Sequence, residues 1–252
     1  FYQLSQTLKL DYTNPLSDNW TLESGAMYEI NDVGNDFAVY DEESTGFVVD
    51  SNFTNNFEYN QKVLGVYSTG AYENDKWGSK LGLRVENTDL TTRLVANNEI
   101  NNQNFTNLFP TVHTSYKFSK KVQLQAGYSR RIFRPRLWDL NPFFTFSDAR
   151  NQRTGNPNLD PELTHSVEMG HIKYFEKGTI TSSAYYRYSE GTISRSIRTV
   201  LNDQQTLSRP ENLKDEHAYG LEFTIGYTPF KWWRINSDLN FYRAITDGSN
   251  IS

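Results

Sequence analysis

Apolar and polar residues alternate with a period of two along most of the chain. Near its start, the apolar side chains share one parity: Tyr2, Leu4, Leu8, Leu10 and Tyr12. The residues that alternate with them are polar as far as Asp11. Because successive side chains of a β-strand point to opposite faces, this pattern predicts a strand with one apolar and one polar face.

The same pattern recurs to the end of the chain and predicts about ten strands of roughly 9 to 12 residues or more. Clear examples are the ranges 112–118 and 122–128, which flank a tight turn, and the ranges 219–227 and 233–241. A strand that crosses a bilayer at a tilt needs roughly 9 to 11 residues. The predicted lengths therefore match a membrane barrel.

Two segments depart from strict alternation. Lys62–Tyr67 is apolar on both parities, and the apolar positions of Ser166–Tyr174 change phase after Met169. A β-bulge or a face buried on both sides explains either segment, and the sequence leaves both alternatives open.

The predicted connections alternate between short and long. Short connections fall at Thr13–Asn19, Glu73–Lys76, Ser119–Lys121, Phe175–Gly178 and Thr228–Lys231. Long polar connections fall at Asn31–Asn56, Thr91–Asn107, Ile132–Leu163 and Glu190–His217. All short connections therefore lie at one end of the strand array, as in outer-membrane barrels with short periplasmic turns and long extracellular loops.

Aromatic residues gather near both ends of the predicted strands. The short-turn end has Trp20, Trp77, Phe118, Phe175, Phe230, Trp232 and Trp233, and the long-loop end has Tyr28, Tyr128, Tyr188 and Tyr219. Two such belts are typical of membrane interfaces. These patterns favour an all-β fold, an antiparallel transmembrane β-barrel, over a soluble β-sandwich, whose core would use the same alternation.

Composition alone would describe a soluble domain: 252 residues, 37% of them hydrophobic, with a mean hydropathy of -0.70. A barrel gives the same average, because each lipid-facing residue is averaged with a lumen-facing one and with polar loops. No stretch approaches the roughly 20 apolar residues of a membrane helix. The aromatic content of 15% suits strands and interfacial belts.

Charge and residue types exclude further classes. A net charge of -5 without a basic stripe argues against nucleic-acid binding. The absence of cysteine excludes disulfides, thiolate metal sites and cysteine nucleophiles. Glu162, His165 and Glu168 have metal-like helical spacing, but on a strand His165 faces away from the two carboxylates. We therefore expect a protein that is not an enzyme, with no catalytic residues, no metal site and no cofactor.

Three motifs follow one another in the second half of the chain. The first comprises Asn107-Leu108-Phe109-Pro110-Thr111, Tyr128-Ser129-Arg130-Arg131-Ile132-Phe133-Arg134-Pro135 and Trp138-Asp139-Leu140-Asn141-Pro142-Phe143. The second is Gly155-Asn156-Pro157-Asn158-Leu159-Asp160-Pro161-Glu162, and the third is Tyr219-Gly220-Leu221-Glu222-Phe223 before Pro229-Phe230-Lys231-Trp232-Trp233. Together they resemble the barrel of TonB-dependent outer-membrane receptors, in the form common in Bacteroidetes-type bacteria. The resemblance covers most of residues 107–242, and residues 1–106 fit by pattern only.

The resemblance implies a barrel of about 22 strands around a plug domain. It also implies a place in the outer membrane of a Gram-negative bacterium and a TonB-type energy-coupling protein that acts on the plug. Relative to such a barrel, residues 1–252 hold about half of the strands and no plug. We therefore expect one partial outer-membrane β-barrel domain, an internal segment of a longer protein, with a complete small barrel as the alternative.

Charged residues on the polar parity are candidates for lining the lumen. Lys80, Arg84 and Glu86 share one predicted strand, Glu222 lies on another, and Arg234 and Asp238 lie on a third. Lumen side chains tune the selectivity of a barrel. Contact with the plug, or ion pairing within the interior, is the alternative role.

A second candidate group lies where a predicted strand leaves the membrane: Arg130, Arg131, Arg134, Arg136, Trp138 and Asp139. Guanidinium groups bind phosphates and carboxylates well, so the arginines are candidates for an anionic ligand or for lipopolysaccharide phosphates. Several prolines shape the same connection, and anchoring of a loop is the alternative role.

Three functions remain open from the sequence. The first is a segment of an outer-membrane receptor for active uptake of a scarce or bulky ligand, such as a siderophore, a glycan or a peptide. The second is a structural or secretion-associated outer-membrane barrel component, and the third is a soluble β-rich binding module. Expected partners of the membrane protein are outer-membrane lipid and lipopolysaccharide, the coupling protein, and a surface lipoprotein or other assembly partner.

Overall fold

The computed structural model describes residues 1–44, 46–50, 54–143, 145–146, 150–202 and 205–251. Ten strands of this described part form one sheet, in the order β1-β2-β5-β6-β7-β8-β11-β12-β15-β16, and every pair in it is antiparallel. Strand neighbours in the sheet are also neighbours along the chain, so the predicted meander is confirmed. The strands are Tyr2–Pro15 (β1), Trp20–Phe37 (β2), Asn55–Glu73 (β5), Trp77–Leu94 (β6), Glu99–Ser119 (β7), Val122–Phe133 (β8), Glu162–Phe175 (β11), Gly178–Glu190 (β12), Asp215–Phe230 (β15) and Trp233–Asp247 (β16).

Shorter elements lie in the long connections. A hairpin pairs β3 with β4, and a small sheet has the order β13-β14-β10-β9. Their bounds are Tyr40–Glu43 (β3), Gly46–Val49 (β4), Thr145–Phe146 (β9), Asn151–Arg153 (β10), Ile193–Asn202 (β13) and Gln205–Asn212 (β14), with the helices Leu137–Leu140 (α1) and Ser249–Ile251 (η1). No helix in the described residues is both long and apolar enough to cross a membrane.

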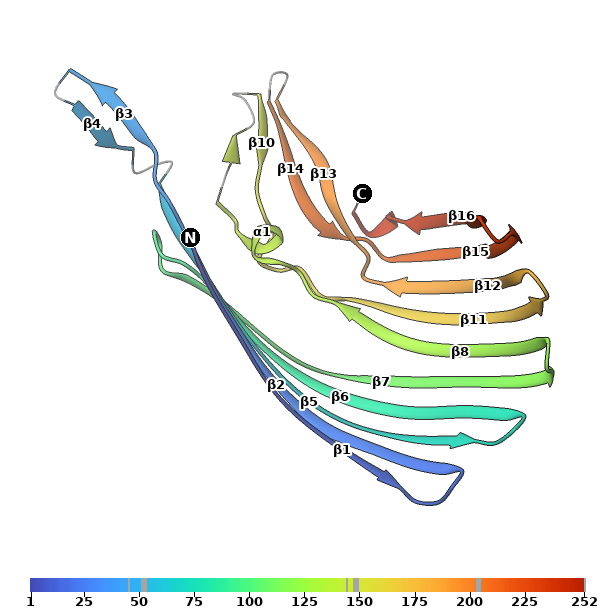
Figure 1. Ribbon diagram of the computed structural model, residues 1–252. Helices are drawn as coiled ribbons and strands as arrows, with labels where there is room; N and C mark the ends of the chain where they lie inside the picture. Colours follow the sequence, from blue (N-terminus) through green and yellow to red (C-terminus); the bar gives the residue numbers. More distant parts are fainter. Residues whose placement is uncertain (45, 51–53, 144, 147–149, 203–204, 252) are drawn as a thin grey trace.

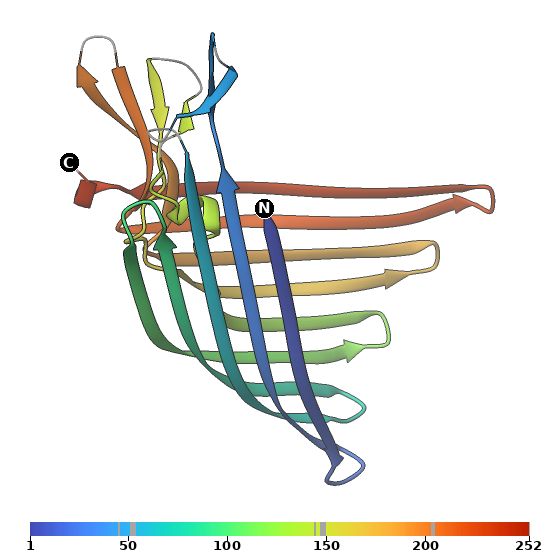
Figure 2. The same ribbon diagram turned by 90° about the vertical axis from the view of Figure 1, so that its left-hand side faces the viewer.

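The sheet is strongly curved, and α1 lies on its concave side (Figure 1). The tight turns between paired strands lie at one end, except the turn between β6 and β7, and β3, β4, β10, β13 and β14 project from the other end (Figures 1 and 2). The five predicted short connections therefore lie at one end, which we call the turn end, and we call the other the loop end.

One predicted long connection, Thr91–Asn107, is wrong. β6 continues to Leu94 and β7 begins at Glu99, so only residues 95–98 form the turn. The two strands stay in register through this region, from Trp77↔Tyr116 to Leu94↔Glu99. Polar residues predominate there because the strands extend beyond the height at which lipid requires apolar side chains.

The two irregular segments contain no bulge. β5 pairs continuously with both neighbours, and Val63 is buried on the concave face while Leu64 and Val66 are exposed on the convex face. β11 also keeps one register with β8 and β12, which places His171 on the same face as Met169. The apparent change of phase in β11 is therefore a polar residue on the convex face.

The convex face is an exposed apolar surface. Large apolar side chains point outward from strand after strand, among them Leu10, Leu64, Leu81, Leu124, Met169, Leu221 and Phe241. Soluble monomers rarely expose apolar patches of this extent. The concave face is mostly polar, and a cluster of buried apolar side chains lies toward the loop end: Val33, Phe57, Tyr59, Leu90, Leu137, Leu140 and Leu159.

Candidate functional site

The connection between β8 and β11 folds back over the concave face. Leu140 and Leu159 are fully buried there and pack in one cluster with Phe57 of β5 and Leu90 of β6. Tyr59 of β5 adds a polar contact to this connection, because its hydroxyl donates a hydrogen bond of 3.5 Å to the carbonyl oxygen of Pro135. We call the described residues of this connection, 134–143, 145–146 and 150–161, the inward segment. It narrows the loop end of the sheet's concave side.

The second motif of the sequence closes the inward segment on itself. The Gly155 N–H donates to the Asn141 carbonyl at 2.8 Å, and the Asn156 N–H donates to the Asp139 carbonyl at 2.7 Å. The buried Asn156 side chain also donates to the carbonyl of Pro210, at 3.1 Å. A side chain at Gly155 would collide with Asn141, which explains a glycine there. The motif therefore anchors this loop.

Glu86 and Arg134 join the inward segment to the wall. Arg134 Nη2 donates to Glu86 Oε2 at 2.5 Å and to Thr88 Oγ1 at 3.0 Å, and its Nε donates to Thr88 Oγ1 at 3.1 Å. Glu86 also forms an ion pair with Arg84 of the same strand. The Glu86 side chain is only 7% exposed, so both arginines balance a buried charge. We call Glu86, Thr88 and Arg134 the latch.

Charges on the rest of this wall are largely paired. Lys80 Nζ lies 2.6 Å from Glu23 Oε2, and Lys9 Nζ lies 3.2 Å from Asp11 Oδ2. The Tyr67 hydroxyl donates to Asp11. A cavity of 420 Å³ opens among these residues toward the turn end, bounded also by Phe109, Thr111 and His113. The geometry thus brings Lys80, Arg84 and Glu86 together on one polar wall.

The other predicted lumen residues lie elsewhere. Glu222 pairs with Asn240 in register, and Asp238 pairs with Thr224, whose hydroxyl donates to its Oδ1 at 2.8 Å. Both residues, and Arg234 by its alternation in β16, share the concave face. They lie on β15 and β16, at the opposite edge of the sheet from β1. The structure does not bring them to the latch.

The four arginines of the sequence cluster are separated in space. Arg130 lies on the convex face, paired in register with His165, whereas Arg131 points to the concave face and borders a cavity of 630 Å³. Arg134 belongs to the latch. Arg136 precedes α1, with its guanidinium 5.7 Å from the ring of Phe133. Alternation along β8 and the turn after it explain why neighbours in sequence serve different surfaces.

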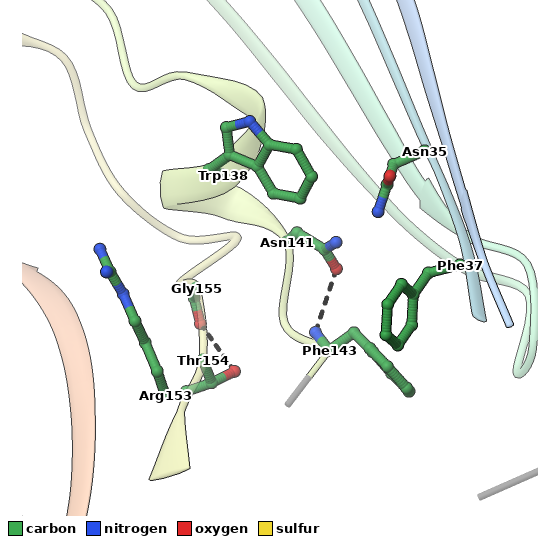
Figure 3. A pocket seen from close by; sticks show the side chains of 8 residues that line it. All are labelled: Asn35, Phe37, Trp138, Asn141, Phe143, Arg153, Thr154 and Gly155. Atoms are coloured by element: carbon green, nitrogen blue, oxygen red, sulfur yellow. Dashed lines mark hydrogen bonds between the residues drawn. The ribbon is translucent and has the colours of Figure 1, made fainter. Parts of the chain in front are cut away.

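A pocket of 410 Å³ lies between β2 and the inward segment (Figure 3). Its lining residues are Asn35, Phe37, Trp138, Asn141, Phe143, Arg153, Thr154 and Gly155. Trp138 is 59% exposed, and the rings of Phe37 and Phe143 are tilted to each other with centroids 6.3 Å apart. Aromatic faces beside amide and guanidinium groups make an amphipathic lining. We call this the mouth pocket.

The structure separates two of the predicted site residues, Trp138 and Asp139, at the mouth pocket. Trp138 borders it, but Asp139, also in α1, is buried, and its carboxylate accepts the Arg136 N–H at 3.1 Å and lies 3.6 Å from Arg195 Nε. Sequence reasoning missed Asn35 and Phe37. Continuing the alternation of β2 past its apolar part would have placed both on the concave face.

No group of three or more metal-ligating side chains converges within the described residues. His165 Nδ1 lies 2.9 Å from the Tyr128 hydroxyl on the convex face, whereas Glu162 accepts the N–H of Ile193 at 3.2 Å. The two residues therefore point to different surfaces, which agrees with the argument from strand alternation.

An apolar convex face, a polar concave face and sorted connections define the wall of an outer-membrane β-barrel. The family model described as "Outer membrane protein beta-barrel family" matches residues 2–252, and the chain belongs to this family. The predictions of an antiparallel barrel fold and of a place in the Gram-negative outer membrane are thereby confirmed. No curated protein sequence shows significant similarity to the chain.

Solved structures with the same fold include transporters and receptors. "Copper transporter OprC" superposes with a TM-score of 0.78 at 16% identity, covering 98% of this chain and 38% of that protein. The FrpB iron transporter from Neisseria meningitidis superposes with a TM-score of 0.67 at 11% identity, covering 97% of this chain and 36% of that protein. The ferric yersiniabactin uptake receptor FyuA from Yersinia pestis superposes with a TM-score of 0.64 at 11% identity, covering 97% of this chain and 35% of that protein. The chain thus spans little more than a third of these proteins.

Proposed function

We propose that the chain forms the wall and the outer mouth of a receptor for active uptake across the outer membrane. The ligand is scarce or too bulky for passive diffusion, of the class of siderophores, glycans or peptides. A TonB-type coupling protein acts through a plug outside these residues. No residue of the chain has a catalytic role in this function.

One observation carries the proposal. The inward segment is fastened to the concave wall by the latch and by a buried apolar cluster, and it presents the mouth pocket at the loop end. A barrel with a purely structural role has no need of an amphipathic pocket held rigidly over its interior. The similar solved structures, which are described as transporters and an uptake receptor, support the same function.

The barrel wall offers a route below the mouth pocket. Paired charges line the concave face from the latch to Lys80 and Lys9, and a cavity of 420 Å³ opens among them. Ion pairs keep such a wall polar without a large net field. We propose that Lys80, Arg84, Glu86, Glu222, Arg234 and Asp238 line this interior, where a ligand or the plug contacts them.

A growth assay tests the proposal. A strain that lacks the gene is compared with its parent on ferric siderophores, glycans and peptides, each supplied as the limiting nutrient. We expect at least one nutrient to require the gene and to require the TonB-type coupling protein as well. Normal growth of the deletion strain on every nutrient of these three classes, or growth that needs the gene but not the coupling protein, would contradict the proposal.

A further inference from the structure

Five aromatic rings form a continuous group on the convex face toward the loop end: Tyr128, His165, Tyr186, Tyr188 and His217. Neighbouring ring centroids are 5.0 to 6.3 Å apart. The Tyr128 hydroxyl lies 2.9 Å from His165 Nδ1, and the Tyr186 hydroxyl lies 2.7 Å from His217 Nδ1. We call this group the ring platform. It spans β8, β11, β12 and β15.

Two arginines flank the ring platform on the same face. Arg130 of β8 is paired in register with His165, and Arg243 of β16 is paired with Tyr219, which in turn pairs with Tyr186. Four strand spacings separate β8 from β16 in the sheet, or about 19 Å between backbones. Arg130 Nη1 donates to the Leu108 carbonyl at 3.2 Å, which fixes the side chain against the convex face.

The ring platform lies at the outer edge of the apolar band. Arg243 is the tenth residue after Trp233 at the turn end. At roughly 3.3 Å per residue and a tilt of about 40°, ten residues rise about 25 Å, the height of the apolar band of such barrels. The row below the platform is apolar, with Met169, Leu221 and Phe241 exposed.

Other charged groups near the ring platform lie closer to the loop end than the rings do. Asp215 Oδ1 lies 3.6 Å from His217 Nε2, and Lys214 Nζ lies 2.8 Å from Asp247 Oδ2. Asp215 pairs in register with both Glu190 and Asp247. These three carboxylates therefore lie side by side, between the ring platform and the loops. Of the charged groups described around the platform, the two arginines thus lie nearest to the apolar row below it.

We propose that the ring platform binds a phosphorylated glycolipid of the outer leaflet. Guanidinium groups bind phosphate by charge-assisted hydrogen bonds, and aromatic faces accept the apolar faces of sugar rings. The apolar row below meets the acyl chains. Two cations on either side of a ring surface match a sugar headgroup with phosphates at both ends. This site is distinct from the mouth pocket and does not depend on the uptake function.

The test measures lipid retention by the full-length protein in detergent micelles, using native mass spectrometry. The probes are diphosphoryl lipid A, monophosphoryl lipid A and an uncharged glycolipid. The Arg130→Gln/Arg243→Gln variant should bind diphosphoryl lipid A at least tenfold more weakly than the unmodified protein. Arg131→Gln is the matched control, because the neighbouring residue points to the concave face, and its binding should not change.

Heat-modifiable migration on gels shows that each variant has folded. The single variant Arg130→Lys keeps a cation at this position, so it should bind diphosphoryl lipid A more tightly than the single variant Arg130→Gln. Equal retention of the three lipids by the unmodified protein would overturn the proposal. So would unchanged retention in the folded double variant. A variant that changes the oligomeric state but not lipid retention would show that a second copy of the protein covers the ring platform instead.

Discussion

Glu86 and Arg134 are 48 residues apart in the chain and meet on the concave face, where Arg134 Nη2 donates a hydrogen bond of 2.5 Å to Glu86 Oε2. Glu86 belongs to the rigid wall, because β6 pairs along its length with both β5 and β7. Arg134 begins the inward segment. Their bond therefore holds the start of a long connection at a fixed place on the concave face.

Substitution of Glu86 tests the latch. Glu86→Gln leaves Arg84 and Arg134 without a carboxylate in a mostly buried site, which should destabilise the inward segment by about 1–3 kcal/mol. The sheet should remain intact, because its ladder is untouched. Hydrogen exchange measured on peptides from residues 137–143 and 154–159 should become faster by roughly tenfold or more.

The matched control for the latch is Glu23→Gln. Glu23 also pairs with a cation, Lys80, at 2.6 Å, but both side chains are at least 40% exposed. An exposed pair contributes about 0–1 kcal/mol, so exchange in the inward segment should not change. If both variants behave alike, the latch does not hold the segment.

Gly155 tests the close approach inside the inward segment. A Cβ atom at this position would lie 2.5 Å from the Asn141 carbonyl oxygen, so Gly155→Ala forces the backbone apart at a cost of about 1–3 kcal/mol. Gly70→Ala is the control, since a Cβ there meets nothing within 4 Å. Protease nicking near residue 155 should rise in Gly155→Ala only. Equal resistance of both variants would contradict the packing described for Asn141.

Neighbouring residues of β8 test the assignment of faces. Leu124 is exposed on the convex face, and Gln123 points to the concave face. Leu124→Arg should disrupt assembly in the membrane by roughly 2–4 kcal/mol, whereas Gln123→Arg should be tolerated. The fraction of heat-modifiable protein in outer-membrane preparations measures this. Equal tolerance at the two positions would contradict this assignment of the two faces.

Strand alternation and the spacing of connections were enough to predict the meander, its two faces and the sorted ends. They failed at residues 91–107, because polar residues on both faces look like a loop although β6 and β7 remain paired there. The hydropathy pattern indicates where a strand leaves the lipid, whereas the hydrogen bonding between β6 and β7 continues beyond that point.

The site was only partly predictable for a different reason. Parity placed Lys80, Arg84 and Glu86 on one face, but the partner of Glu86 comes from a connection whose path no periodicity describes. The arginines at 130, 131, 134 and 136 looked like one cluster because the alternation was not followed to the end of β8 at Phe133, and because the sequence does not show that the chain then turns inward. Asn35 and Phe37 lie beyond the apolar part of β2, where the pattern is weak.

Trp138 tests the mouth pocket once the growth assay has identified a nutrient. Its side chain is exposed, so Trp138→Ala should leave folding intact and weaken binding of that nutrient by the purified full-length protein roughly tenfold or more. Trp77→Ala, at the turn end of β6, is the control for losing an exposed indole. Isothermal titration of both variants measures the difference. Unchanged affinity in Trp138→Ala would exclude the mouth pocket as the capture site.

The most direct test of active uptake is the initial rate at which whole cells accumulate that nutrient, labelled, with and without the TonB-type coupling protein. Active uptake predicts a rate that saturates at low external concentration, requires the full-length protein, and falls to background when the coupling protein is deleted. A rate that increases in proportion to concentration and persists without the coupling protein would show a passive pore and would contradict it.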